Sequence, residues 1–220
     1  MTWDKLAPLL LEGMADTLYM TLWSSAVAYL IGLPLGVLLV ITRKGGIMQS
    51  LTLNAVLGVV INFLRSIPFI IMLAMLFPVT RAVMGTAIGT RAIIFPLVIS
   101  AFPYVARMVE SSLEEVDHGI IEAAQSMGST NWQIILKVLL PESIPSLANG
   151  AAISVTTILS YTALASAAGG GGLGSLAIVK GLNVRKFDIM YSASLLLVAL
   201  VQIITVFGTR FTRGLDHKRR

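Results

Sequence analysis

The chain has 220 residues, of which 56% are apolar and 12% are charged, whereas about a quarter of the residues in an ordinary soluble domain are charged. With a mean hydropathy of +0.86, this composition excludes a soluble globular protein and indicates a single-domain integral membrane protein over residues 1–220. The net charge of +5 comes from basic residues at the ends of apolar segments, which is typical of membrane flanks and not of a nucleic-acid surface.

Apolar segments that are long enough to cross a membrane recur along the chain. A bilayer core of roughly 30 Å requires about 20 apolar residues in a helix. The expected spans are about 17–41, 54–79, 92–109, 144–168 and 188–208. The sequence therefore predicts an all-α membrane protein with five transmembrane helices, preceded by a short amphipathic segment over 1–16.

Two features stand out in the first half of the chain. Gly32 and Gly36 lie four residues apart in the first span, a spacing that either permits close approach of another helix or marks a kink. In the second span, neither 51–64 nor 68–78 is long enough alone, so together they form one span that contains Arg65. The interval 81–91 is expected to be a short loop.

Arg65 is the one strongly charged residue well inside a predicted span. It either snorkels or bonds backbone carbonyls near Pro68, or it contacts the solute on a translocation path; both interpretations remain open. Asn149, Thr156 and Ser160 of the fourth span fall within about 40° of one another on a helix. That stripe serves either helix–helix hydrogen bonding or the lining of the same path.

The long polar interval 110–142 interrupts the apolar segments and is predicted to hold two short helices. Asp117 can cap the first helix, and Gly128 can end it in a left-handed conformation. One residue of 129–131 can cap the second helix, which Pro141 is expected to stop. Glu122 in the first helix also has a purely local explanation, because an acid there is favoured by the helix dipole.

The same interval carries a recognisable pattern. Glu122-Ala123-Ala124 is followed after three residues by Gly128, and nine residues later by Val138-Leu139-Leu140-Pro141. This pattern resembles the EAA signature of the permease subunits of bacterial ATP-binding-cassette importers, with Val in place of the usual Ile at 138. Within that family the chain most resembles the methionine-importer permeases. The segments that carry this further resemblance are 65–70, 106–110 and 171–174.

The resemblance implies a type I importer permease fold in a bacterial cell membrane. It implies a homodimer with the pathway at its two-fold axis, two cytoplasmic ATPase subunits and an extracytoplasmic substrate-binding lipoprotein. The substrate would be an amino acid, methionine in either enantiomer, and no cofactor is implied. The segment 110–142 would be the cytoplasmic coupling segment, with Ala123 and Ala124 buried against the ATPase. The implied ATPase-coupling residues are Glu122, Ala123, Ala124, Gly128, Leu140 and Pro141.

The residues themselves favour an external energy source and no bond chemistry. Residues 17–109 contain no Asp or Glu, whereas proton-coupled transporters usually place a titratable group in the bundle. The chain also lacks a phosphate-binding loop, and the glycines of 169–174 are expected to form a hinge or sharp reversal. The alternatives are a permease of the same type for another small polar solute, a secondary transporter, or a membrane enzyme that relies on Asp117-His118.

Charge predicts the orientation in the membrane. Five spans place the two termini on opposite sides, and the largest basic cluster follows the last span, which predicts a cytoplasmic C-terminus. That cluster consists of Arg210, Arg213, Lys218, Arg219 and Arg220. The basic residues of 81–91 and 180–186 then fall outside, against the usual bias.

Overall fold

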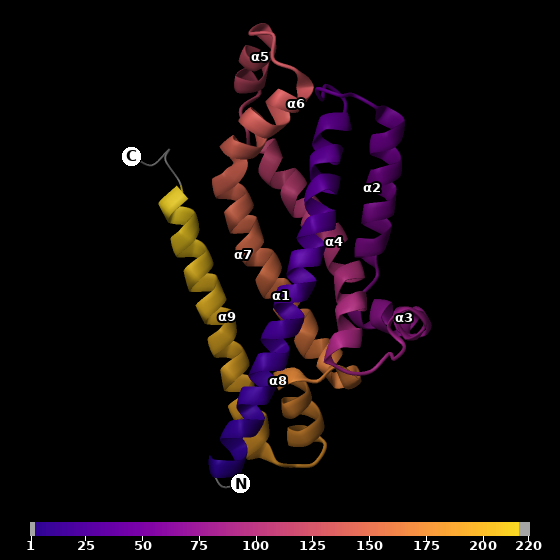
Figure 1. The fold of residues 1–220 in the computed structure, drawn as a ribbon, viewed down its shortest axis with the longest axis vertical. Helices are drawn as coiled ribbons and strands as arrows, with labels where there is room; N and C mark the ends of the chain where they lie inside the picture. Colours follow the sequence, from indigo (N-terminus) through magenta and orange to yellow (C-terminus); the bar gives the residue numbers. More distant parts are fainter. Residues whose placement is uncertain (1–2, 216–220) are drawn as a thin grey trace. The chain divides into compact units, whose positions relative to one another are not determined.

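The computed structural model describes residues 3–215, and helices follow one another along nearly all of that length (Figure 1). No strand occurs between Trp3 and Leu215, and the expected all-α fold is confirmed. The α-helices are α1 (Trp3–Thr42), α2 (Leu51–Ser66), α3 (Phe69–Met84), α4 (Thr90–Glu114), α5 (His118–Ser126), α6 (Asn131–Ile134), α7 (Leu140–Ala165), α8 (Gly172–Ser175) and α9 (Phe187–Leu215). Two π-helical turns, at Ile135–Leu139 and Leu176–Leu182, and a kinked turn at Ser166–Gly170, where Gly169 has φ +99°, lie between them.

The chain divides into two compact units. The first takes residues 3–28, 67–101 and 155–205, and the second takes 29–66, 102–154 and 206–215. In the first unit, Leu6 and Leu10 of α1 pack with Leu173 and Leu176 in one buried apolar cluster. In the second unit, the buried cluster joins residues of α1, α2 and α4, which are Leu39, Ile61 and Ala106.

An arginine also fastens α2 to α4 in the second unit. The Arg107 guanidinium pairs with the Glu110 carboxylate at 2.6 Å and donates to the Asn62 side-chain oxygen at 2.9 Å. It donates further to the Gly58 carbonyl at 3.3 Å. Because this charge is paired and hydrogen-bonded, its partial burial is tolerated.

Among the described residues 3–215, four helices are long and apolar enough to cross a membrane, and a bent pair provides a fifth candidate span. The long ones are Leu6–Thr42, Thr90–Glu114, Asn131–Ala165 and Phe187–Arg210. The expected span 54–79 is this bent pair, α2 and α3, which turn by 102° at their junction. Pro68 supplies the reason, since its ring disfavours a helical conformation at the preceding residue, and its own ψ of 137° is non-helical.

Several boundaries differ from the prediction. The described part of 1–16 is no separate segment, because α1 runs unbroken for 40 residues, about 60 Å of helix. The helix that carries the span predicted from 144 begins at Asn131. Arg81 and Arg91 lie in helices, so the loop between α3 and α4 covers only 85–89. The helix over Gly172–Leu182 was missed, although Leu173, Leu176 and Ala177 have helical spacing.

Gly32 and Gly36 mark a close approach of α1 to α4 within the second unit. A Cβ at Gly32 would lie 2.7 Å from Val105 Cγ1, and a Cβ at Gly36 would lie 2.6 Å from the Ala106 carbonyl oxygen. Real Cβ contacts are longer than this, so the two backbones meet only because both positions are glycine. The small-residue interpretation is therefore confirmed for this pair.

We expect Gly36→Ala to destabilise the protein by about 1–3 kcal/mol, because the new methyl group meets rigid backbone in α4. Gly58→Ala is the matched control, since its Cβ would make an ordinary 3.6 Å contact with the Arg107 side chain. Both changes raise helix propensity equally. Thermal unfolding of the detergent-solubilised protein measures the difference, and equal midpoints for the two variants would contradict the close approach.

Candidate functional site

The first helix of the predicted coupling segment is fixed at both ends by its own hydrogen bonds. The Asp117 side chain accepts the N–H of Gly119 at 2.7 Å and caps the start of α5. At the other end, Ser129 N–H donates to the Ala124 carbonyl at 3.1 Å and Gly128 N–H to the Gln125 carbonyl at 2.9 Å. These two bonds form a Schellman motif. Gly128 has φ +79°, so its predicted left-handed conformation is confirmed.

The second helix starts with a capping box. The Thr130 hydroxyl accepts the N–H of Gln133 at 3.3 Å, while the Gln133 side chain accepts the N–H of Thr130 at 2.8 Å. Two orphan donors are thereby satisfied at the turn. The sequence left Ser129, Thr130 and Asn131 open as caps, and the structure selects Thr130.

The prediction that Pro141 stops this helix is wrong. The chain continues from α6 through the π-helical turn at Ile135–Leu139 into α7, with Pro141 as its second residue. Leu140 N–H donates to the Ile135 carbonyl five residues back, which inserts an extra residue into the turn. This wider turn makes room for the proline ring, and Pro141 then occupies a first-turn position where a missing N–H is harmless.

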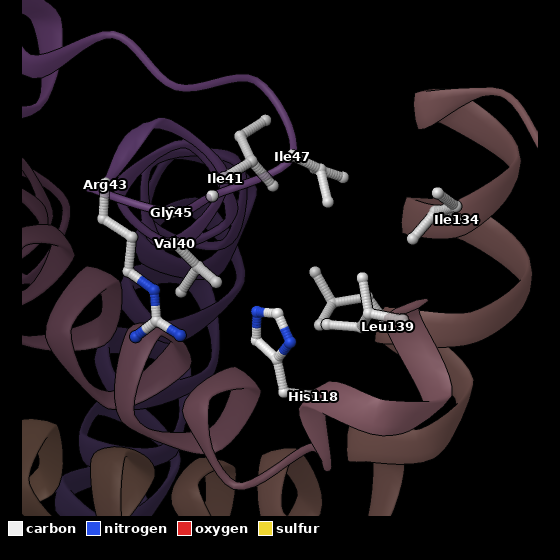
Figure 2. Close-up of a pocket in the computed structure, with 10 residues that line it drawn as sticks. Val40, Ile41, Arg43, Gly45, Ile47, His118, Ile134 and Leu139 are labelled. Carbon is white, nitrogen blue, oxygen red and sulfur yellow. The ribbon is translucent and has the colours of Figure 1, made fainter. Parts of the chain in front are cut away.

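The coupling segment rests on the end of α1 within the second unit. A small hollow of about 30 Å³ lies between them. Figure 2 shows the His118 ring and the Arg43 side chain among the residues that line it. Residues of α1 and the loop after it line one side, and Ile134 and Leu139 line the other. The Arg43 guanidinium also forms an ion pair with Glu114 in the last turn of α4. The pair of helices α5 and α6 therefore packs near the linked ends of α1 and α4.

The two motif alanines differ in exposure. Ala123 is exposed, whereas Ala124 is 3% exposed within its own chain. The expectation that both would be buried against an ATPase is therefore wrong for Ala124, which faces inward. Glu122 is exposed and pairs with His118, one turn earlier, at 3.2 Å. Of the other motif residues, Pro141 is exposed and Leu140 is half-buried.

Two large apolar side chains on this segment were missed by the sequence analysis. Met127, which ends α5, is 79% exposed, and Trp132 in the first turn of α6 is 66% exposed. The sequence carried no signal for the exposure of Trp132, because at 3.6 residues per turn it falls within about 20° of Leu139 on a helix. Exposed aromatic and Met side chains are typical of protein–protein interfaces.

The candidate path residues are divided between the two units. In the second unit, Arg65 lies exposed in the last turn of α2, and Asn149 is exposed on α7. In the first unit, Ser160 is exposed and donates to the carbonyl of half-buried Thr156 at 3.2 Å. The structure describes no ion pair for Arg65 within residues 3–215.

The glycine segment 169–174 forms a tightly held reversal in the first unit. Gly171 and Gly172 have φ +78° and +75°, so the predicted sharp reversal is confirmed. The buried Thr17 hydroxyl donates to the Gly13 carbonyl at 2.8 Å and accepts the N–H of Leu173 at 2.9 Å. This hydroxyl ties the reversal to α1, and Gly89 N–H donates to the Gly169 carbonyl at 2.9 Å.

We expect Gly172→Ala to slow transport strongly, because the new Cβ would lie 2.7 Å from the Thr17 hydroxyl oxygen at a conformation that side chains disfavour. Gly85→Ala is the matched control, since Gly85 has φ +77° but no neighbouring atom within 4 Å of a Cβ. Solute uptake into vesicles separates the two. If both variants transport equally, the reversal is only a permissive linker.

The chain combines membrane-spanning helices with a capped, exposed helix pair between them. This combination is typical of the class of permease subunits that are driven by a separate protein. The chain belongs to the family of inner membrane components of binding-protein-dependent transport systems, whose family model matches residues 28–220.

Several relatives narrow the comparison. A probable D-methionine transport system permease protein, MetI, of Vibrio cholerae is 47% identical over 210 residues, which cover 96% of this chain and 93% of that protein. The D-methionine permease MetI of Escherichia coli is 47% identical over 156 residues, covering 71% and 72% of the two chains.

Solved structures agree with these relatives. The chain superimposes on one from the MetNI methionine ABC transporter, solved in inward-facing conformations, with a TM-score of 0.96 and 42% identity. The match covers 99% of this chain and 100% of that one. An amino acid ABC transporter matches with a TM-score of 0.74 at 22% identity, over 98% and 96% of the chains, which supports the fold alone.

Proposed function

We propose that this chain is the translocating subunit of an ATP-driven importer of methionine. Two copies form the path, two cytoplasmic ATPase subunits supply the energy, and an extracytoplasmic binding protein delivers the amino acid. The chain itself performs no bond chemistry. The coupling segment passes the closure of the ATPase pair to the spans, which alternate between inward-open and outward-open states.

The observation that carries this proposal is that α5 is ordered by its own chain and still has an exposed face. It is capped at both ends and seated on its own chain through Ala124, yet it leaves Glu122, Ala123 and Met127 exposed. A rigid helix with an exposed face outside the spans fits a docking surface for a second protein. The substrate class rests on the relatives, which are named as D-methionine permeases over nearly the whole length of this chain.

The test is reconstitution of the permease with its ATPase in lipid vesicles, with the binding protein added outside. We expect ATP-dependent uptake of labelled methionine, competed by unlabelled D- and L-methionine. Uptake of a different small polar solute would leave the permease assignment standing and remove methionine. Uptake without an ATPase subunit, driven by a proton gradient, would indicate a secondary transporter and overturn the proposal.

The orientation is tested separately. We expect a reporter that is active only in the cytoplasm to be active when fused after Arg220 and silent when inserted into the loop 85–89. The expectation follows from the basic residues beyond the last span, of which Lys218, Arg219 and Arg220 lie outside the described residues. Activity at both positions would contradict the expected three spans between the loop 85–89 and the C-terminus.

A further inference from the structure

A groove between α7 and α9 in the first unit has no role in the coupling described above. Its volume is about 520 Å³, within the range of small-molecule sites. Buried Leu159 forms part of its wall, with Ala163 beside it on α7 and with Leu197 and Val201 facing from α9. These side chains give the groove an aliphatic surface.

Two polar side chains stand out against that surface. Ser160 of α7 and Gln202 of α9 both line the groove, and both are exposed. Each lies within a helix that is long and apolar enough to span the membrane. The Ser160 hydroxyl already bonds its own helix, but an amide turned toward lipid tails would lack partners and cost free energy, so Gln202 requires a polar neighbour or a hydrated path.

The charge of the lining limits what the groove can accept. None of the residues that line it is charged. A solute with a net charge would lose its hydration without a counter-ion there. A zwitterionic amino acid with an apolar side chain needs no counter-ion, because its ammonium and carboxylate can be satisfied by neutral hydrogen-bonding groups. Its side chain gains the aliphatic wall.

Building on the proposed function, we infer that this groove is a methionine-binding subsite of the translocation path. The thioether chain lies along Leu159, Ala163 and Val201, where a polarizable sulfur packs well. The Ser160 hydroxyl already donates to the Thr156 carbonyl, so its oxygen is left to accept the ammonium. The Gln202 amide offers an oxygen to the ammonium and an N–H to the carboxylate. Gln202 of α9 is a specificity-determining residue. The sequence analysis did not include it, because the polar stripe that it identified lies on α7.

The experiment uses the reconstituted permease–ATPase complex and photo-methionine, a diazirine analogue of the substrate. After irradiation, we expect adducts on 159–164 and 197–202, and excess methionine should prevent them. Gln202→Leu and Ser160→Ala should each weaken methionine binding about tenfold or more, because each removes a hydrogen bond to a charged group.

Thr205→Val is the matched control. Thr205 lies one turn beyond Gln202 on α9, is exposed, and donates to its own helix through the Val201 carbonyl, as Ser160 does on α7. It does not line the groove, so binding should stay at the wild-type level. Absence of adducts in the groove would mean that lipid or the second copy occupies it, and adducts that excess methionine does not prevent would mean nonspecific labelling. Either result would overturn the inference.

The two proposals fail separately. If the wild-type complex takes up no methionine, the proposed function itself is wrong. If wild-type uptake is normal but the adducts map elsewhere, or the Gln202 and Ser160 variants bind as tightly as wild type, only the groove assignment is wrong.

Discussion

Gly128→Val should abolish solute uptake while leaving the membrane-spanning helices folded. Gly128 holds φ +79°, which costs an L-residue about 1–2 kcal/mol and a β-branched residue more. A Cβ at this position would meet no atom within 4 Å, so the penalty is conformational and not steric. If residue 128 left the left-handed conformation to avoid this penalty, the two Schellman bonds would break. Thr130 and α6 would then turn in a new direction.

The substitution Gly128→Asn provides the control for this result. Asn tolerates the left-handed region far better than Val does, so it should retain most of the uptake. Uptake and pull-down of the ATPase subunit are measured on the same membranes. Normal uptake by the Val variant would show that 110–142 is an ordinary loop, and the importer assignment would lose its main structural support.

Ala124→Glu should be equally severe, but for a different reason from the one that the motif suggests. Because Ala124 is buried in its own chain, a glutamate there would bring an unpaired charge into the contact beneath α5. Such burial costs several kcal/mol. We expect α5 to come away from the residues that bury Ala124, with loss of both ATPase binding and uptake.

Ala123→Glu separates folding of the segment from docking. Ala123 is adjacent and exposed, so the same charge leaves the fold of α5 intact and disturbs only a partner on its outer face. Limited proteolysis of the coupling segment in the absence of ATPase should be fast for Ala124→Glu and at the wild-type rate for Ala123→Glu. Equal protection of both variants would contradict the inward orientation of Ala124.

The sequence supported the local backbone features well. The left-handed Gly128, the Asp117 cap, and the reversal at Gly171 and Gly172 depend on short-range sterics and hydrogen bonds. These constraints are present in a few neighbouring residues, so inspection of the chain can identify them. The apolar periodicity likewise predicted the class of fold.

The errors arose where distant contacts decide the outcome. Pro141 is a helix breaker in isolation, but the π-helical turn before it shifts the hydrogen-bond pattern and keeps the helix continuous. Ala124 cannot be distinguished from Ala123 until the seat beneath α5 is known. Gln202 was missed because its significance depends on Ser160 across the groove, on a helix that the sequence cannot position.

In the proposed complex, the caps at both ends of α5 determine the thermodynamics of ATPase binding. A nine-residue helix is marginal in water when isolated, yet here Asp117, the Schellman bonds and the seat of Ala124 order it within its own chain. The ATPase then meets a preorganised surface, and association carries little of the entropy penalty of coupled folding. Binding should show only the heat-capacity change of surface burial, and a free peptide of 117–140 should compete poorly.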